Sequence, residues 1–130
     1  MWYNYIGDGM DCVFCKIVEG ILPSKKVYED DLIIGIMDID PYCDGHVLLI
    51  PKKHYTDMME LDSDILKHIN DVAKDLTKKL MTKLDKKSMT VSYNYGDKQV
   101  VKHFHLHLLP NIDDKPTHTV DEMYDSIMNN

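Results

Sequence analysis

The clearest periodic pattern of apolar residues lies between residues 62 and 84. Apolar side chains recur there at steps of three and four, with lysines and aspartates between them, at Ile65, Ile69, Val72, Leu76, Leu80 and Leu84. This spacing predicts an amphipathic helix of about six turns. Asp62 or Ser63 is suited to cap it, because a short polar side chain can accept a hydrogen bond from a free N–H group of the first turn.

Shorter apolar segments on both sides of this helix indicate strands. Before it, KKVYED and DLIIGIMDI form a predicted hairpin, and HVLLIP is a buried strand that Pro51 ends. KIVEGILPS is a short helical turn, SMTVSYNY is a later strand, and the acidic C-terminal segment is expected to end in a short helix. This order predicts one α+β domain over residues 1–130, with a mostly antiparallel sheet and the long helix packed on one face.

The segment VKHFHLHLLP, residues 101–110, alternates apolar residues with histidine. On a strand, its apolar side chains would face the core while His103, His105 and His107 share the other face. Such a row can bind a metal, relay protons or attack an electrophile. Alternate residues of a strand are about 7 Å apart and zinc–nitrogen bonds measure roughly 2.0–2.1 Å, so one strand supplies two ligands more easily than three. Nucleophilic attack is therefore the more economical hypothesis.

Composition narrows the classes of partner. The formal net charge of the 130-residue chain is −7, which argues against a surface that coats nucleic acid. All 15 basic residues are lysine, so a bound phosphate would be held by imidazole, backbone N–H groups or lysine. Three cysteines do not make a disulfide framework, no signal peptide is visible, and the longest apolar runs are too short to span a bilayer. We expect a cytoplasmic protein without a membrane partner.

Several motifs together resemble the histidine triad family of nucleotide hydrolases and transferases. The segment HFHLHLL matches the family motif at every position, and DCVFCKIVEGILPSKKVYEDD, IMDIDP and GHVLLIPKKH extend the match from about residue 11 to residue 110. The resemblance implies a five-stranded antiparallel sheet with one long and one short helix, assembled as a homodimer. Residues 1–10 would be an N-terminal extension and residues 111–130 a C-terminal tail.

The resemblance also implies a chemistry. His105 would attack the α-phosphate of a purine nucleoside phosphoramidate or related nucleotide ester, and water would then release AMP or GMP from a nucleotidyl-histidine. His107 would contact the phosphate and the leaving group, while His103 and His46 would orient the attacking ring. No cofactor is needed for these steps. Asp38 would hold the ribose hydroxyls, although a solvated loop aspartate is the alternative.

Other positions match the family's binding residues less specifically. Asn94 and Gln99 would lie beside the phosphate, although Asn94 is also a common turn residue. The slot for the base would be formed by apolar residues that could equally belong to the core, namely Val13, Phe14, Ile17, Ile36, Met37 and Ile39.

A second constellation consists of Cys12, Cys15, His54 and His103. Two cysteines two residues apart and two histidines can form a tetrahedral zinc set, and some bacterial-type members of the family carry zinc at matching positions. Such an ion would be structural. Two reduced, partly buried cysteines remain an alternative, and a thioredoxin-like redox pair lacks the surrounding βαβ pattern.

Two positions depart from the family pattern and leave the leaving group open. Lys98 stands where glycine is common, and Val100 replaces a frequent serine or threonine. A dinucleoside polyphosphate hydrolase is therefore the alternative enzyme. A nucleotide-binding or zinc-stabilised interaction module with little turnover and a histidine-rich metal buffer are alternatives of other classes. The lysine pair Lys52-Lys53 is interpreted as a solvated strand end rather than a phosphate contact.

Overall fold

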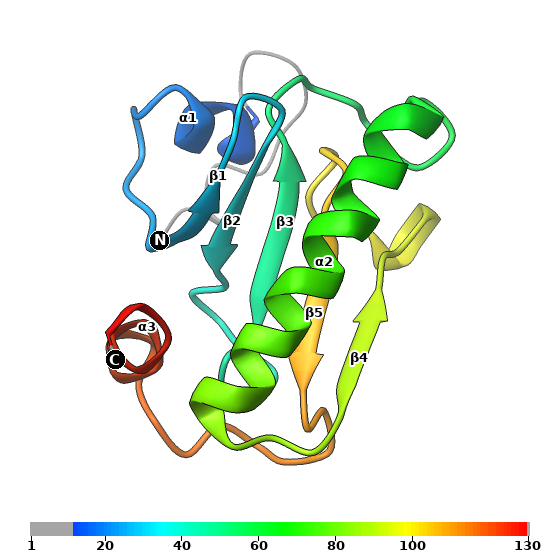
Figure 1. Ribbon diagram of the computed structural model, residues 1–130. Coiled ribbons are helices and arrows are strands. Elements are labelled where there is room, and N and C mark those ends of the chain that lie inside the picture. Colours follow the sequence, from blue (N-terminus) through cyan, green and yellow to red (C-terminus); the bar gives the residue numbers. More distant parts are fainter. Residues whose placement is uncertain (1–11, 130) are drawn as a thin grey trace.

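The computed structural model describes residues 12–129, and its centre is one antiparallel sheet of five strands (Figure 1). The strands are β1 (Lys26–Glu29), β2 (Ile33–Met37), β3 (Val47–Pro51), β4 (Met89–Ser92) and β5 (Leu106–Pro110). Their spatial order is β1-β2-β3-β5-β4, and every neighbouring pair is antiparallel. The predicted α+β fold with a five-stranded antiparallel sheet is confirmed.

Three α-helices accompany the sheet over the described residues, namely α1 (Val13–Val18), α2 (Ser63–Leu84) and α3 (Val120–Met128). A short 3-10 turn, η3 (Gly96–Lys98), connects β4 to the segment before β5. Helix α2 is the predicted long helix, and Asp62 caps it by accepting the N–H of Asp64 at 3.1 Å. The expected short helix in the tail is α3.

The alternation of side chains divides the sheet into two faces. Val47 and Leu49 of β3 belong to the core that packs against α2, whereas Leu48 and Ile50 pack with Phe14 of α1. Helix α2 lies diagonally across its face of the sheet (Figure 1). The opposite face carries α1 at one end and the histidines described below.

Strand β5 is shorter than predicted. It begins at Leu106, so the expectation of a strand over residues 101–110 is wrong for its first half. If the register of β3 and β5 continued, Pro51 would face Phe104, and proline has no N–H group to donate to a ladder. The N–H of Phe104 instead donates to the carbonyl of Tyr55 at 2.7 Å, so the chain leaves the sheet and carries His103 and His105 in an irregular segment.

The C-terminal tail is fixed to the domain by one buried carboxylate. Asp44 accepts four hydrogen bonds, from the backbone N–H and hydroxyl of Thr117 and from the backbone N–H and Nδ1 of His118. Burial alone would raise the pKa of Asp44, but the bonds from His118 and Thr117 outweigh it and lower the pKa to about 2. Met123 and Ile127 of α3 then complete the core beside α2.

The proposed N-terminal extension, residues 1–10, lies outside the described residues, and the division into extension, domain and tail stays a prediction. Among residues 12–129, the structure has no helix that is both long enough and apolar enough to cross a membrane.

Candidate active site

Four histidines meet on the face of the sheet opposite α2. His107 lies on β5 opposite Leu48, His46 directly precedes β3, and His103 and His105 precede β5. The ring centroids of His46 and His107 are 5.1 Å apart, and those of His105 and His107 are 5.0 Å apart. The fold thus brings the three histidines of residues 101–110 into one cluster with His46.

The hydrogen bond of His105 defines which of its nitrogens is free. Nδ1 of His105 lies 2.8 Å from the carbonyl oxygen of His103. Because a carbonyl can only accept, Nδ1 carries the proton, and a neutral ring then keeps its lone pair on Nε2. Burial lowers the pKa of His105 below its ordinary value, although the bond to His103 and the charge of Asp38 partly oppose this. The ring is therefore neutral at pH 7 and has an unprotonated Nε2.

A second chain of hydrogen bonds defines the protons of His46 and His107. The backbone N–H of Tyr42 donates to Nδ1 of His46 at 3.2 Å, so His46 carries its proton on Nε2. That Nε2 lies 2.9 Å from Nδ1 of His107, which must accept. His107 consequently carries its own proton on Nε2, a buried atom that has no partner among the described residues. The hydrogen-bond chain therefore ends in a buried N–H group that no described residue accepts.

Burial keeps both of these rings neutral. It lowers the pKa of His46 to about 4, and the nearby His105 adds to the shift. It likewise lowers the pKa of His107 to about 3, with further contributions from His105 and His46. At pH 7 each ring therefore holds one proton, which is the condition that the hydrogen-bond chain requires.

The histidine cluster opens into a cavity of about 410 Å³. The cavity is lined by Asp38, Asp40, Pro41, Tyr42, Asn94, Lys98, Val100, Val101, His105 and His107. Asp38 is buried, accepts the N–H of Asp40 at 2.9 Å, and has a carboxylate oxygen 3.7 Å from Nε2 of His46. A carboxylate held in this way can accept hydrogen bonds from ligand hydroxyl groups.

The predicted phosphate neighbours fall in different places. Asn94 lines the cavity. Gln99 does not line it, because its side chain is buried and its Nε2 donates to the carbonyls of Thr56 and Val101 at 2.7 and 3.1 Å. Gln99 therefore anchors the segment between η3 and β5 to the loop that follows β3.

The residues predicted for a base slot are divided between the two faces of the sheet. Phe14 contacts the cluster directly, with its ring centroid 5.1 Å from that of His105. The others on this face are Val13, Ile17, Ile36 and the partly buried Ile39. Met37 instead belongs to the core on the α2 face, because it alternates with Ile36 along β2.

The predicted zinc ligands form a second cluster beside the first. Sγ of Cys12 lies 3.3 Å and Sγ of Cys15 lies 3.5 Å from Nδ1 of His103, and Sγ of Cys15 lies 3.2 Å from Nδ1 of His54. All four ligand atoms lie within 4.8 Å of one another. Ligands of a tetrahedral zinc ion are roughly 3.3–3.8 Å apart, so this set fits the ion.

The position of the proton on the His103 ring is consistent with a zinc site. Its Nε2 lies 2.8 Å from the carbonyl of Pro51 and must donate, so the lone pair on Nδ1 points at the thiols. Burial, with Cys12 nearby, raises the pKa of the Cys15 thiol to about 12. A divalent cation would reverse that preference, because it binds the thiolate.

A third set of possible ligands, Asp38, His46 and His107, also lies within 4.8 Å. Here the hydrogen bonds argue against an ion. His46 can bind a metal through Nε2 only if its proton moves to Nδ1, and Nδ1 already accepts the N–H of Tyr42. The hydrogen bonds of this group therefore favour proton transfer over metal binding.

Sequence reasoning missed the backbone groups that set these protons, namely the N–H of Tyr42 and the carbonyls of Pro51 and His103. No pattern of residue types signals them, because every residue except proline carries both groups.

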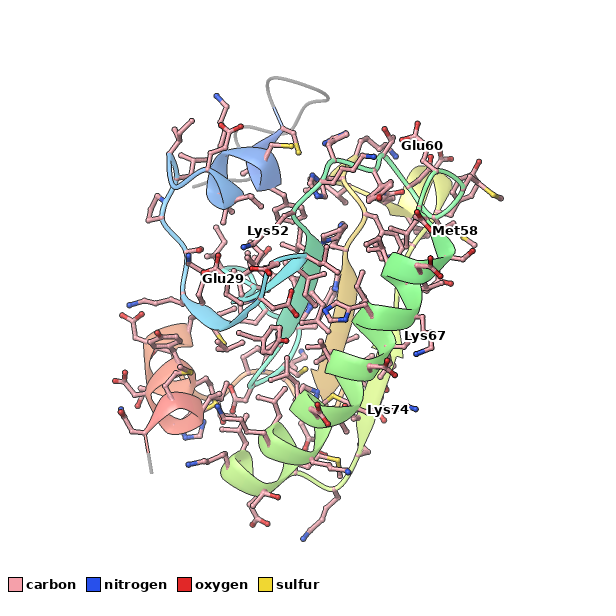
Figure 2. The ribbon with its side chains drawn as sticks, turned by 45° about the horizontal axis from the view of Figure 1, so that its top comes forward. Glu29, Lys52, Met58, Glu60, Lys67 and Lys74 are labelled. Carbon is pink, nitrogen blue, oxygen red and sulfur yellow. The ribbon has the colours of Figure 1, made fainter. Side chains whose placement is uncertain are left out.

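The lysines outside the cavity have other partners or face solvent. Nζ of Lys52 lies 2.9 Å from the carboxylate of Glu29, so it joins the end of β3 to β1 (Figure 2). Lys67 and Lys74 project from the outer side of α2 (Figure 2). None of these three lines the cavity.

Comparisons with known proteins agree with the fold and the histidine motif. The HIT domain model matches residues 19–114. An adenosine 5′-monophosphoramidase of Candida albicans is 38% identical over 111 residues, which cover 79% of this chain and 72% of that protein. An adenylylsulfatase of Arabidopsis thaliana is 34% identical over 102 residues, 77% of this chain and 52% of that protein.

Solved structures agree as well. A zinc-bound histidine triad family protein from Mycobacterium smegmatis superposes with a TM-score of 0.84 at 29% identity, covering 92% of this chain and 91% of that one. The chain belongs to the HIT family, in which the histidine motif gives the family its name.

Proposed function

We propose that this protein is a nucleotide hydrolase that cleaves purine nucleoside 5′-phosphoramidates through a nucleotidyl-His105 intermediate and releases AMP or GMP. The observation that carries the proposal is the bond from Nδ1 of His105 to the carbonyl of His103, because it leaves Nε2 unprotonated beside the cavity. The similarity to the monophosphoramidase of Candida albicans supports the class of substrate.

In the first step, the lone pair on Nε2 of His105 attacks the α-phosphorus and the bond to the leaving amine breaks. The N–H on Nε2 of His107 would bind a phosphate oxygen. The negative charge of that phosphate would favour an extra proton on the His107–His46 pair, which Nε2 of His107 would pass to the departing nitrogen, so that both rings are neutral again. One difficult displacement becomes two easier ones.

In the second step, water attacks phosphorus and the bond to His105 breaks. The water gives its proton to the His107–His46 pair, and the nucleoside monophosphate leaves. Asp38 accepts the ribose hydroxyls, and we assign the base to the apolar residues around Phe14, which are buried in this structure. We assign Asn94 to the phosphate side of the cavity and Gln99 to fixing the loop that borders it.

The chemistry needs no metal. We propose that Cys12, Cys15, His54 and His103 hold a structural zinc ion, which would tie α1 to the segment before β5. Bound zinc would supply folding free energy, since all four positions would be filled by protein ligands. The zinc-bound relative from Mycobacterium smegmatis supports this assignment.

We further propose a cytoplasmic homodimer. Strand β4 lies at one edge of the sheet and Val91 on it is 47% exposed, so this edge is suited to pairing with a second copy. Light scattering coupled to size exclusion would show twice the mass of the 130-residue chain, and a monomer at micromolar concentration would contradict the assignment.

The test of the activity is a hydrolysis assay with the phosphoramidates of adenosine, guanosine and cytidine, together with a diadenosine polyphosphate. We expect release of AMP and GMP well above the rate for the cytidine compound. Faster cleavage of the polyphosphate would favour the alternative hydrolase, which the lysine in the cavity also supports. Nucleotide binding without any product would favour a binding module instead.

A further inference from the structure

Lys98 is the only lysine among the residues that line the cavity within the described part of the chain. It ends η3, in the connection between β4 and β5, whereas Asp38 and Asp40 belong to the segment between β2 and β3. The lining residues between β2 and β3 thus form an acidic wall, those between β4 and β5 form a wall with one lysine, and the histidines complete the lining.

The backbone that carries Lys98 is held on both sides. Nζ of Lys102 donates to the carbonyls of Gly96 and Gln99 at 2.9 and 2.7 Å, and the N–H of Gln99 donates to the carbonyl of Gly96 at 3.0 Å. The next residues are anchored as well, because Gln99 and Val101 are 4% and 1% exposed. An exposed ammonium group thus extends from a fixed turn at the border of the cavity.

This wall has little else that could recognise a leaving group. Val100, which is 60% exposed, offers only an apolar side chain, and Asn94 is the other polar side chain on this wall. If Asp38 receives the ribose hydroxyls, the acidic wall is occupied and the other wall is left to contact the leaving group. The charged side chain of that wall is Lys98.

We propose that Lys98 selects leaving groups that carry a negative charge a few bonds from the departing atom. This inference rests on the proposed function and adds the chemical class of its leaving group. The shared chemistry is an anionic oxygen group, and its source can be the carboxylate of an amino acid, a sulfate or a second phosphate. An ammonium group binds each of these as a point charge.

The expected effect is moderate because Lys98 is exposed. Ion pairs in contact with solvent change an equilibrium constant by up to about fivefold, and added salt weakens them. Removing the charge should therefore lower the preference for an anionic leaving group by about fivefold at low ionic strength, and less at high salt.

The experiment compares two adenosine phosphoramidates that differ in one charge, those of β-alanine and of β-alaninamide. The ratio of their kcat/KM values is measured for the wild type and for Lys98→Gln, Lys98→Arg and Lys87→Gln. Lys87 is the matched control, because it is an exposed lysine outside the cavity. Comparing this ratio between variants cancels the difference in intrinsic reactivity of the two amines.

We expect the ratio to fall about fivefold in Lys98→Gln and to stay near the wild-type value in Lys98→Arg and Lys87→Gln. A ratio in Lys98→Gln that matches the wild type, or an equal fall in Lys87→Gln, would overturn the proposal. The same ratio is measured for adenosine 5′-phosphosulfate and for diadenosine triphosphate, with the β-alaninamide compound as the reference. These two ratios identify the preferred source of negative charge.

The dissociation constants of the same compounds are also measured in a His105→Asn background, where the proposed nucleophile is absent. Their ratio replaces the ratio of kcat/KM values. A charge preference that depends on Lys98 in this background supports the inference even if the wild type fails to hydrolyse any of the compounds. Lack of hydrolysis would then contradict the proposed function alone.

Discussion

The cluster of Cys12, Cys15, His54 and His103 and the cluster of His46, His105 and His107 lie side by side on one face of the sheet, yet their hydrogen bonds give them different chemistry. In the first cluster, the two thiols and the Nδ1 atoms of His54 and His103 converge on one point. In the second, Tyr42 donates to His46 and His46 donates to His107, whose remaining N–H has no acceptor among the described residues. His105 instead donates to a carbonyl and keeps the lone pair on its Nε2.

The backbone group on the far side of each ring causes this difference. Pro51 accepts from His103 and directs its lone pair to the thiols, whereas the N–H of Tyr42 directs the proton of His46 toward His107. His103 belongs to both arrangements, because its ring faces the thiols while its carbonyl sets the proton of His105. The same residue type can thus serve as a metal ligand or a proton carrier according to its partner.

The largest expected effect separates the proposed nucleophile, His105, from every other imidazole. His105→Asn should lower kcat by at least about 10⁴-fold, because no other group can take the role of Nε2, while AMP binding changes little. Stopped assays and calorimetric titration with AMP measure the two quantities. His118→Asn is the control, since that ring lies outside the cavity and should keep kcat within a few-fold. Equal rates in the wild type and His105→Asn would contradict the assignment.

The second effect concerns the proposed zinc ligands. Cys15→Ser should remove bound zinc and lower the free energy of unfolding by several kcal/mol, since the ion would bind only the folded chain. It should lower kcat by roughly tenfold, through the carbonyl of His103. Metal analysis and urea unfolding measure these changes. Cys43→Ala is the control, because it removes a cysteine outside the cluster and should keep zinc. If the wild type is purified without zinc and cannot be loaded with it, the metal assignment is wrong.

The third effect is the pH dependence of stability from His46 and His107. Their pKa values, about 4 and about 3, lie below the ordinary value, so the unfolded chain binds more protons at acidic pH. Stability should therefore be constant above about pH 6.5 and fall as the pH decreases toward 4, by roughly 2 kcal/mol for each ring at pH 5.

Urea unfolding at pH 7 and pH 5 measures this loss, with a chelator present so that zinc release does not contribute. In His46→Gln and His107→Gln the decrease between the two pH values should be smaller than in the wild type. An unchanged slope in both variants would show that these rings are not held neutral by burial.

The smallest effect lies outside both clusters, where Asp44 meets His118. Asp44→Asn removes a buried charge that accepts four hydrogen bonds and should lower the free energy of unfolding by about 1–3 kcal/mol, because the charged bonds to the C-terminal segment are lost. Asp113→Asn, at an exposed loop position, should be neutral. Thermal unfolding measures both, and equal midpoints for the two variants would contradict the anchoring role of Asp44.

Part of this structure could be predicted from residue patterns because the pattern itself carries the information. The apolar spacing between residues 62 and 84 gave helix α2 and its cap at Asp62, and the cysteine spacing gave a pair of thiols at the start of α1. The histidine alternation indicated that several imidazoles share a face. Each of these features depends on the local sequence and on the residue periodicity of a single helix or strand.

The remainder depends on contacts between distant segments. Strand β5 begins late because Pro51, more than fifty residues earlier, cannot donate to it. The side chain of Gln99 is buried and does not face the cavity, because its Nε2 donates to the carbonyl of Thr56. The proton positions on His46 and His103 follow from backbone groups of Tyr42 and Pro51, and no residue pattern specifies those contacts.

The most direct measurement is a rapid quench of the enzyme with α-phosphate-labelled adenosine phosphoramidate into alkaline denaturant, since a phosphorus–nitrogen bond to imidazole breaks readily once the ring is protonated. Peptide mapping then locates the label. We predict transient labelling of the peptide that contains His105, with an amplitude approaching one nucleotide per chain and a decay that matches AMP release. Steady release of AMP with no labelled peptide at any time would contradict covalent attack by His105.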